Sequence, residues 1–328
     1  MIVVTGGAGF IGSNLLAALE AKGHHDLVVI DRLGSDDKWR NIAKRELVAV
    51  IPPEETFAYL DDHAAEIDAI FHLGAISATT ETDADLINDS NFRLTMKLWD
   101  WCTWRGARFI YASSAATYGD GSAGFEDSSA IEDLAKFQPL NAYGWSKHAT
   151  DRRIARMVSR GEPTPPQWAG LKFFNVYGPN EYHKGGQKSV VGHIFPRAAK
   201  GEAAKLFRSH RPDYEDGGQL RDFVWVGDVV DVMIWLLERP DVSGLFNVGS
   251  GGARSFKDLA SAVYAALGKA PDIEYIDTPV EIRDKYQYFT QASLDRLRAA
   301  GYDRQTTPLE AGVARYVQEY LAAEDPYL

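Results

Sequence analysis

The chain of 328 residues carries 35 Lys and Arg against 46 Asp and Glu, a formal net charge of −11, and 45% of its residues are hydrophobic. This composition excludes intrinsic disorder, and the acidic balance argues against nucleic-acid binding through phosphate contacts. The single cysteine, Cys102, excludes an intramolecular disulfide and a cysteine-based metal cluster. We expect no membrane contact, because no apolar run approaches the length of a membrane span. We also expect no metal site and a cytoplasmic protein.

Strand-like and helix-like segments alternate from the first residue. The short apolar runs at residues 1–5, 27–30, 68–73, 108–112, 170–174 and 245–248 predict strands. Ile11–Lys22 has apolar side chains at helical spacing and ends at Gly23, and Leu294–Ala300 and Pro308–Leu321 are also predicted helices. This alternation predicts an α/β fold of the Rossmann type, with a doubly wound parallel sheet covered on both faces.

The domain organisation is predicted to be discontinuous. We expect residues 1–174 to form a dinucleotide-binding domain that also receives about 222–250, since the run at 245–248 looks like a return to the sheet. Residues 175–221 and 251–328 would form a smaller mixed α/β lobe that binds substrate. Residues 208–221 are polar and without periodicity, which is typical of a functional or disordered loop.

A glycine-rich turn separates the first predicted strand from the first helix. Gly6, Gly9 and Gly12 permit a tight turn and a close backbone approach to a phosphate, and the helix N-terminus behind them favours an anion. Asp31 follows at the end of the second strand, where an acid meets an adenosine ribose in dinucleotide-binding folds. The pattern therefore predicts a nicotinamide dinucleotide site.

Neighbouring charges leave the identity of the dinucleotide open. Asp31 favours the free 2′-hydroxyl of NAD, whereas Arg32 and Lys38 are cations that can take the 2′-phosphate of NADP.

A second motif carries candidate acid–base chemistry. Tyr143 and Lys147 are four residues apart and share one face of a helix. A lysine ammonium near a phenol lowers the pKa of the phenol, so that it can remove a proton from an alcohol. Ser113 and Ser114 follow the 108–112 strand, at the sheet edge where ligands bind in this fold, and Ser114 completes a Ser–Tyr–Lys set.

These motifs, in this order, resemble the extended short-chain dehydrogenase/reductase family. The resemblance covers the whole chain: the glycine-rich turn, the acid at 31, ASSAATYG (112–119), YGWSK (143–147), FFNVYGP (173–179) and RDFVWVGD (221–228). Three further segments resemble the subgroup of epimerases that invert C6 of a nucleotide-linked heptose for lipopolysaccharide precursors. They are FHLGAISATTETD (71–83), EYHKG (181–185) and YQYFTQA (286–292).

The resemblance implies a mechanism and a set of contacts. A tightly held NADP would oxidise C6 transiently and return the same hydride to the other face, with Tyr143, tuned by Lys147, and Lys184 serving proton transfer on the two sides. Further cofactor contacts would come from Phe10, Ile11, Leu73, Gly74, Ala75, Ile76, Ser77, Asn91 and Val176. Substrate contacts would come from Ser114, Asn175, Lys184, Gly186, His193, Phe207, Arg208, Arg221 and Tyr286.

The chain departs from the family pattern in three places, one of which is the loop 208–221, longer than its family counterpart, and other functions remain open. Leu73 replaces a common glutamate, and Pro52-Pro53-Glu54 stands where a lysine is common. The alternatives are another nucleotide-sugar epimerase, such as a UDP-hexose 4-epimerase, and a non-catalytic dinucleotide-sensing protein. The family also implies a homo-oligomer, a pentamer in this subgroup.

Overall fold

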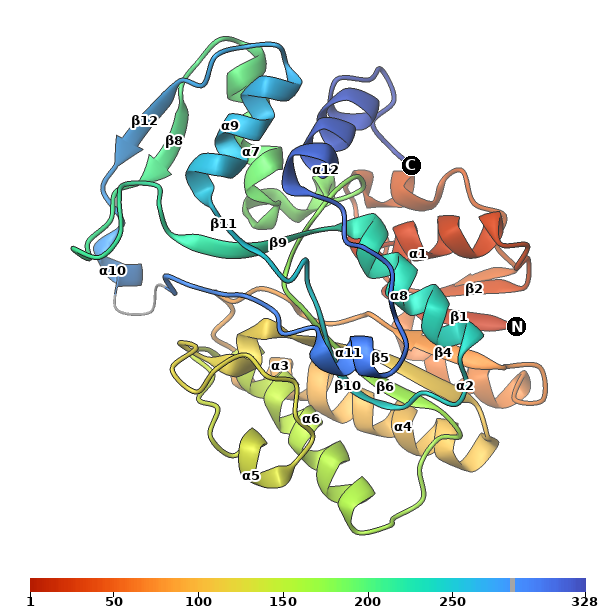
Figure 1. Cartoon of the computed structure of the whole chain (residues 1–328). Coiled ribbons are helices and arrows are strands. Elements are labelled where there is room, and N and C mark those ends of the chain that lie inside the picture. Colours follow the sequence, from red (N-terminus) through yellow and green to blue (C-terminus); the bar gives the residue numbers. More distant parts are fainter. Residues whose placement is uncertain (284–286) are drawn as a thin grey trace.

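The computed structural model describes residues 1–283 and 287–328, and it confirms the expected α/β class (Figure 1). In the described residues the main sheet has seven parallel strands in the order β10-β6-β5-β4-β1-β2-β3. They are β1 (Ile2–Thr5), β2 (Leu27–Ile30), β3 (Ala49–Ile51), β4 (Ala69–His72), β5 (Arg108–Ser114), β6 (Trp168–Phe173) and β10 (Gly244–Val248). The strand order reverses beside β1, which opens a crevice at the carboxyl ends of β1 and β4.

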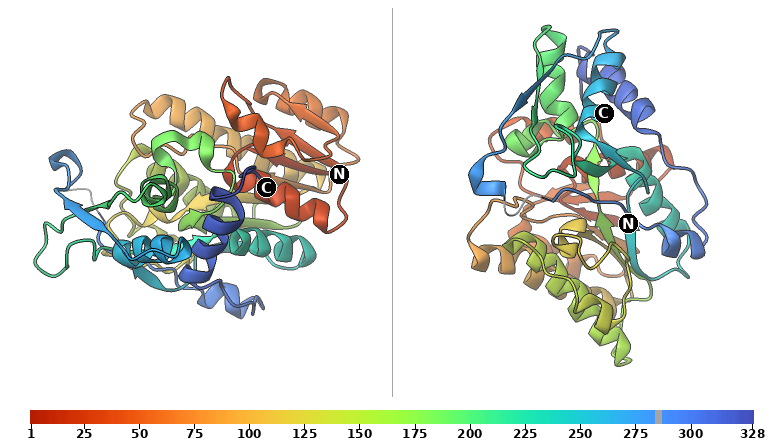
Figure 2. Two further views of the ribbon diagram at one scale, coloured as in Figure 1. Left: turned by 90° about the horizontal axis from the view of Figure 1, so that it is seen from above. Right: turned by 60° about the vertical axis from the view of Figure 1, so that its left-hand side comes forward.

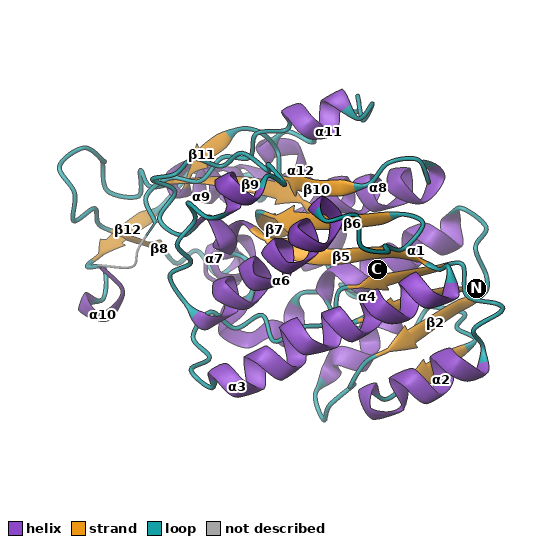
Figure 3. Cartoon of the chain, turned by 90° about the horizontal axis from the view of Figure 1, so that it is seen from below, coloured by secondary structure: helices purple, strands orange, loops and turns teal. Residues whose placement is uncertain are grey.

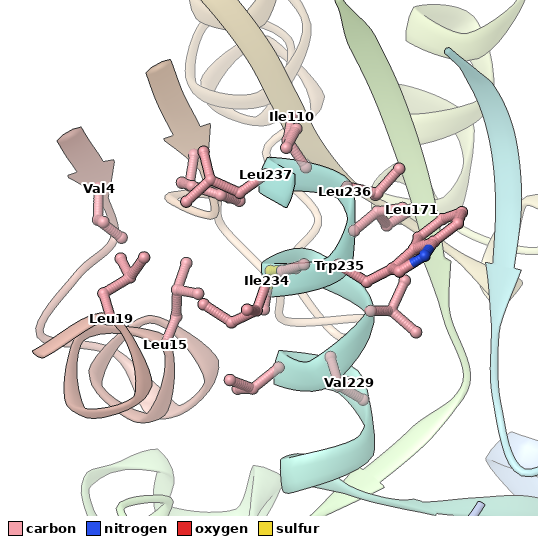
Figure 4. Packing of buried hydrophobic residues seen from close by; sticks show 14 of the residues in the cluster. Val4, Leu15, Leu19, Ile110, Leu171, Val229, Ile234, Trp235, Leu236 and Leu237 are labelled. Carbon is pink, nitrogen blue, oxygen red and sulfur yellow. The ribbon is translucent and has the colours of Figure 1, made fainter. Parts of the chain in front are cut away.

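Helices cover both faces of this sheet. One face carries α1 (Phe10–Ala21) and α8 (Val226–Glu238), and the other carries α2 (Thr56–Asp62), α4 (Leu94–Arg105) and α6 (Ala142–Ser159), with the short α3 (Ala84–Ile87) and α5 (Ile131–Leu134) nearby (Figures 1 and 3). Figure 4 shows Leu15 and Leu19 of α1 and Ile234 of α8 packed beneath Val4. Burial on both faces explains why β1, β2 and β4 consist almost entirely of apolar residues.

A second lobe lies beside the main sheet (Figure 2). Its apolar side chains form a cluster that also includes Phe10 of α1 and Val226 of α8. The strands of this lobe are the antiparallel pair β11 (Ala253–Ser255) and β9 (Leu220–Trp225), the parallel neighbour β7 (Asn175–Tyr177), and the parallel pair β8 (Ala204–Phe207) and β12 (Ile273–Ile276). Its helices are α7 (Val190–Ala199), α9 (Phe256–Ala266) and α12 (Leu309–Arg315), with the short α10 (Val280–Arg283) at its edge. The sequence did not predict these strands, because their pairing depends on distant segments.

The structure gives the path of the chain between the two lobes. β10 pairs with β6, so the chain re-enters the main sheet at Gly244–Val248, and α11 (Asp295–Ala299) contacts β10. The polar stretch 208–221 is a loop only up to β9, which begins at Leu220 and pairs with β7 rather than joining the main sheet. The predicted domain boundaries stay a prediction. No helix in the described ranges is long and apolar enough to cross a membrane.

Candidate active site

Two cavities meet at the carboxyl edge of the main sheet. The first, about 510 Å³, follows the glycine-rich turn and the ends of β1, β2 and β4. The second, about 530 Å³, lies between the main sheet and the second lobe. Both are lined by Phe10, Ile11, Ser77, Tyr143, Phe173, Lys184 and Gln187. Tyr143 and Lys184 therefore lie where a ligand in one cavity would meet a ligand in the other.

The glycine-rich turn is shaped so closely that larger residues do not fit. Gly6 has a φ of +68°, and a Cβ there would lie 2.5 Å from the backbone nitrogen of Gly74. A Cβ on Gly12 would lie 2.3 Å from the carbonyl oxygen of Gly6. Gly9 precedes α1 without a side-chain cap, and the first turn of α1 has no acidic residue, so its N–H groups can receive an anion. The turn fits a dinucleotide pyrophosphate.

At the far end of the first cavity, Asp31 is held in a network. Its carboxylate accepts hydrogen bonds from the Ala8 N–H (3.0 Å) and from Lys38 Nζ (2.7 Å). Lys38 and Asp31 both line the cavity, whereas Arg32 does not, because its guanidinium pairs with Glu54 at the surface. Of the two cations predicted to receive a 2′-phosphate, Lys38 therefore lines the cavity, whereas Arg32 pairs with the exposed Glu54.

The loop after β4 forms the facing wall. Leu73, Gly74, Ala75 and Ser77 line the first cavity, as the sequence predicts for cofactor contacts. Ile76 does not line it, because its N–H and carbonyl are both hydrogen bonded to the side chain of the fully buried Asn91 (2.9 and 3.0 Å).

Asn91 also reaches the opposite helix. Its amide donates to Ser146 Oγ on α6 (3.1 Å). This side chain therefore ties the loop to α6, and its predicted contact with the cofactor stays a prediction.

Tyr143 and Lys147 lie one turn apart on α6, capped by Asn141, and both line the first cavity. Lys147 Nζ donates to the carbonyl oxygen of Ala112 at 2.7 Å, and burial lowers its pKa to about 8. Burial raises the pKa of Tyr143, which a hydrogen bond with Ser114 partly offsets. This differs from our expectation that Lys147 lowers the phenol pKa, because desolvation dominates in the protein itself.

A buried ion pair that sequence reasoning missed lies below this pair. Asp151, one further turn along α6, is fully buried and accepts from Lys172 Nζ (2.6 Å), Ser113 Oγ (2.6 Å) and Tyr111 Oη (2.9 Å). Its charge raises the pKa of Lys147 and so opposes the effect of burial. The spacing 143–147–151 on one helix face was the available signal.

Lys184 approaches from the other side, on the 3₁₀ turn η5 (Tyr182–Gln187). Its ammonium lies 5.5 Å from the ring centroid of Phe10, and burial lowers its pKa while the charge of Glu181 raises it. His183 and Gln187 from the same turn also line the first cavity, and sequence reasoning missed both. Only the family motif pointed to this turn, since a loop lysine has no periodic signal.

The predicted substrate residues divide between two places. Ser114, Asn175, Val176 and Gly186 line the second cavity, although Val176 was predicted as a cofactor contact. His193 and Phe207 line a neighbouring cavity of about 490 Å³, which shares Val190 and Phe256 with the second.

Arg208 and Arg221, the two arginines predicted to bind substrate, line none of these three cavities. Arg221 lies over the Phe256 ring at 5.6 Å, and its guanidinium donates to the Leu220 carbonyl. Arg208 pairs with Asp277 at 3.2 Å. Tyr286 lies outside the described residues. Among the described residues no group of three or more His, Cys, Asp or Glu side chains could hold a metal ion.

Comparisons with known proteins agree with this geometry. The model of the NAD dependent epimerase/dehydratase family matches residues 2–249. An ADP-L-glycero-D-manno-heptose-6-epimerase from Nitratidesulfovibrio vulgaris is 49% identical over 100% of both chains. The structure of the Helicobacter pylori protein of that name has a TM-score of 0.78 at 28% identity, covering 98% of this chain and 96% of that one. A Thermus thermophilus UDP-glucose 4-epimerase, solved with NAD, gives 0.75 at 25% identity, with 98% and 99% covered.

Proposed function

The chain belongs to the NAD dependent epimerase/dehydratase family, and we propose that it inverts C6 of ADP-D-glycero-β-D-manno-heptose to give the L-glycero epimer. One observation carries this proposal: Tyr143 on α6 and Lys184 on η5 both line both cavities, so a sugar carbon where the cavities meet has a candidate proton carrier from each of two separate segments. The full-length relative at 49% identity supports the choice of substrate.

The dinucleotide supplies a hydride acceptor and then a hydride donor when it is bound. Gly6, Gly9 and Gly12 shape the turn that receives its pyrophosphate, and Lys147 lines the same cavity as the reacting phenol. We propose NADP as the resident form, with Lys38 and a rotated Arg32 receiving the 2′-phosphate. The Arg32–Glu54 pair is exposed, and such pairs contribute little, so rotation costs little. The mass of the dinucleotide released on denaturation separates NADP from NAD.

Proton transfer needs two carriers because the sugar presents opposite faces before and after inversion. Burial raises the pKa of Tyr143 in the protein alone, but the Lys147 ammonium and a positively charged nicotinamide would favour its phenolate when the dinucleotide is bound. As the phenolate, Tyr143 would take the proton from the C6 hydroxyl on one side, with Ser114 hydrogen bonded to the reacting oxygen. Lys184 serves the opposite side, where burial keeps its pKa below the usual lysine value. The sequence around Ser114 continues as Ala115-Ala116, without the carboxylate that a dehydratase would need there.

The rest of the substrate follows the cavities away from this wall. Asn175 and Gly186 line the space for the sugar, and His193 and Phe207 line the cavity that would take the adenosine. Arg208 and Arg221 would hold the diphosphate, because a guanidinium grips two oxygens at once. Tyr286, outside the described residues, stays a predicted contact of the nucleotide sugar. We also propose a cytoplasmic homo-pentamer in lipopolysaccharide precursor synthesis, and its mass in solution tests the assembly.

The test is incubation with ADP-D-glycero-β-D-manno-heptose, with the configuration at C6 determined by NMR. We expect both C6 epimers at equilibrium and no turnover of UDP-glucose. Turnover of UDP-glucose without inversion of the heptose would instead identify a UDP-hexose 4-epimerase. Binding of the dinucleotide without turnover of either sugar would contradict both epimerase assignments and favour a non-catalytic dinucleotide-sensing protein.

A further inference from the structure

Glu181 is a buried carboxylate at the start of the Lys184 turn, and the mechanism above does not use it. Its side chain is 1% exposed. One carboxylate oxygen accepts from the Ser189 backbone N–H (2.6 Å), and the other accepts from Ser189 Oγ (2.5 Å) and Tyr316 Oη (2.9 Å). These donors come from the start of α7 and from the π-helical segment Tyr316–Leu321 that follows α12, so Glu181 joins three separate segments.

The pattern of donors favours the ionised form of Glu181. A backbone N–H can only donate, and Ser189 Oγ already accepts from the Gly192 N–H (3.3 Å), which directs its own proton to Glu181. The N-terminus of α7 also stabilises a negative charge. Burial raises the pKa of Glu181, and these three hydrogen bonds oppose that effect.

Besides Glu181, the first half of the turn is held by Tyr182 Oη, which donates to the Pro326 carbonyl oxygen, and by His183 Nδ1, 3.2 Å from Asn41 Nδ2, whereas the half after Lys184 has fewer fixed points. The Lys184 N–H donates to the Glu181 carbonyl oxygen at 3.0 Å, which closes the first part of the turn. Gly185, with φ +54°, and Gly186 follow at once, and a Cβ on either would meet nothing within 4 Å. The Glu181 end is therefore where the turn is fastened.

We propose that Glu181 is a positioning residue, which fastens the turn to α7 and to the C-terminal segment so that Lys184 stands at the wall between the two cavities. The inference rests on the role proposed above for Lys184.

The charges around Lys184 give this position a second consequence. Glu181 raises the pKa of Lys184 and burial lowers it. The other groups that face it are the Phe10 ring from α1, His183 beside it, and Tyr143 from α6, which lines the same cavities. Farther along the first cavity, Lys38 is paired with Asp31, so their charges largely offset each other, and Lys147 from α6 adds positive charge. Removal of the Glu181 charge should therefore lower the pKa of Lys184 further.

The test compares Glu181→Gln with Glu202→Gln in the full chain. Glu202 lies beyond the other end of α7, in a half-exposed pair with Arg197. Trace labelling with acetic anhydride, followed by mass spectrometry, measures the pH midpoint at which Lys184 reacts, and it needs no substrate. Steady-state kinetics with the ADP-heptose give kcat and KM.

We expect E181Q to move the labelling midpoint of Lys184 to lower pH and to reduce kcat by roughly tenfold or more, with KM changed by less than about threefold. E202Q should match the wild type, and Glu181→Asp, which keeps the charge, should recover part of the loss. If E181Q does not fold, Tyr316→Phe removes one donor, and a lower kcat with unchanged KM supports the proposal.

An unchanged midpoint and kcat in E181Q, or unchanged kcat in Y316F when E181Q does not fold, would overturn the proposal. Wild-type protein that fails to invert the heptose contradicts the proposed function instead. In that case the labelling midpoint still tests whether Glu181 acts on Lys184, because labelling needs no substrate.

Discussion

The two sides of the candidate active site are built in different ways. Tyr143 and Lys147 stand on α6, an 18-residue helix packed on the main sheet above the buried Asp151–Lys172 pair. Lys184 stands on a six-residue turn whose second half begins with two glycines. One side is held by packing along a long helix, and the other by a few polar anchors.

The anchors of the Lys184 side come from distant parts of the chain. Tyr182 Oη donates to the Pro326 carbonyl oxygen (2.7 Å), and the Leu328 N–H donates to Asn180 Oδ1 (3.0 Å), so the C-terminal end fastens the turn (Figure 1). Asn180 itself has φ +70° and is fully buried. The difference teaches that a proton carrier on a turn needs fixed points at its base, whereas a helix supplies them along its length.

Tyr143→Phe removes the phenolic hydroxyl from the α6 side of the site. We expect kcat to fall by roughly 10²- to 10⁴-fold because the phenolic proton carrier is lost. Thermal unfolding should change little, and the released dinucleotide should stay the same. A loss below tenfold in the heptose assay would remove Tyr143 from the mechanism.

Asp151→Ala tests the support below that helix side. Removal of one partner of a buried ion pair leaves Lys172 charged and uncompensated, which costs about 3–5 kcal/mol. Urea unfolding measures the loss. Asp213→Ala, which removes an exposed pair with Arg211, is the control and should leave the free energy of unfolding close to the wild-type value. Equal losses for the two variants would contradict the account.

Acid should weaken the sheet beneath the helix side. Burial lowers the pKa of His72 to about 3 from 6.5, so below pH 6.5 the unfolded chain binds a proton that the folded chain refuses. Stability present above pH 6.5 is thus lost as pH falls, by roughly 3 kcal/mol at pH 4 from this group. Urea unfolding from pH 7 to pH 4 measures it. The variant His72→Asn should show a shallower dependence, and an identical slope would exclude His72 as the cause.

Lys184→Met removes the ammonium group from the η5 side of the site. We expect kcat to fall by roughly 10²-fold because one of the two proton carriers is lost. The dinucleotide should remain bound, since the glycine-rich turn is untouched. Lys200→Met, at the exposed C-terminal end of α7 and outside both cavities, is the matched control for the change of side chain. Full activity in the Lys184→Met variant would remove the second carrier.

Deletion of residues 325–328 loosens the base of the turn without touching a reacting group. We expect kcat to fall roughly fivefold, the equivalent of about 1 kcal/mol in hydrogen bonds. Lys22→Ala, which removes an exposed pair with Glu238, should leave kcat unchanged. If the truncated chain retains wild-type kcat, the C-terminal end does not hold the turn.

The parts of the fold that were predictable are those encoded by neighbours in the sequence. The glycine-rich turn, the Tyr143–Lys147 spacing and the buried strands depend on residues close together, and the structure has them where they were expected. The network of Asn91, the pair Asp151–Lys172 and the anchors of Glu181 join segments far apart in the chain. The spacing 143–147–151 indicates that Asp151 shares a helix face with Tyr143 and Lys147, but residue pattern contains no signal for the partners that these groups find in distant segments. Arg32 also has a partner, Glu54, that spacing could not show.

The most direct test of inversion by transient oxidation is the reaction in D₂O. The heptose is incubated with the enzyme and its resident dinucleotide, and C6 is followed by NMR and mass spectrometry. Our account predicts complete equilibration of the two C6 epimers with hydrogen, not deuterium, on C6, because the hydride returns to the carbon that it left. Deuterium on C6 of the product, or no inversion at saturating substrate, would contradict it.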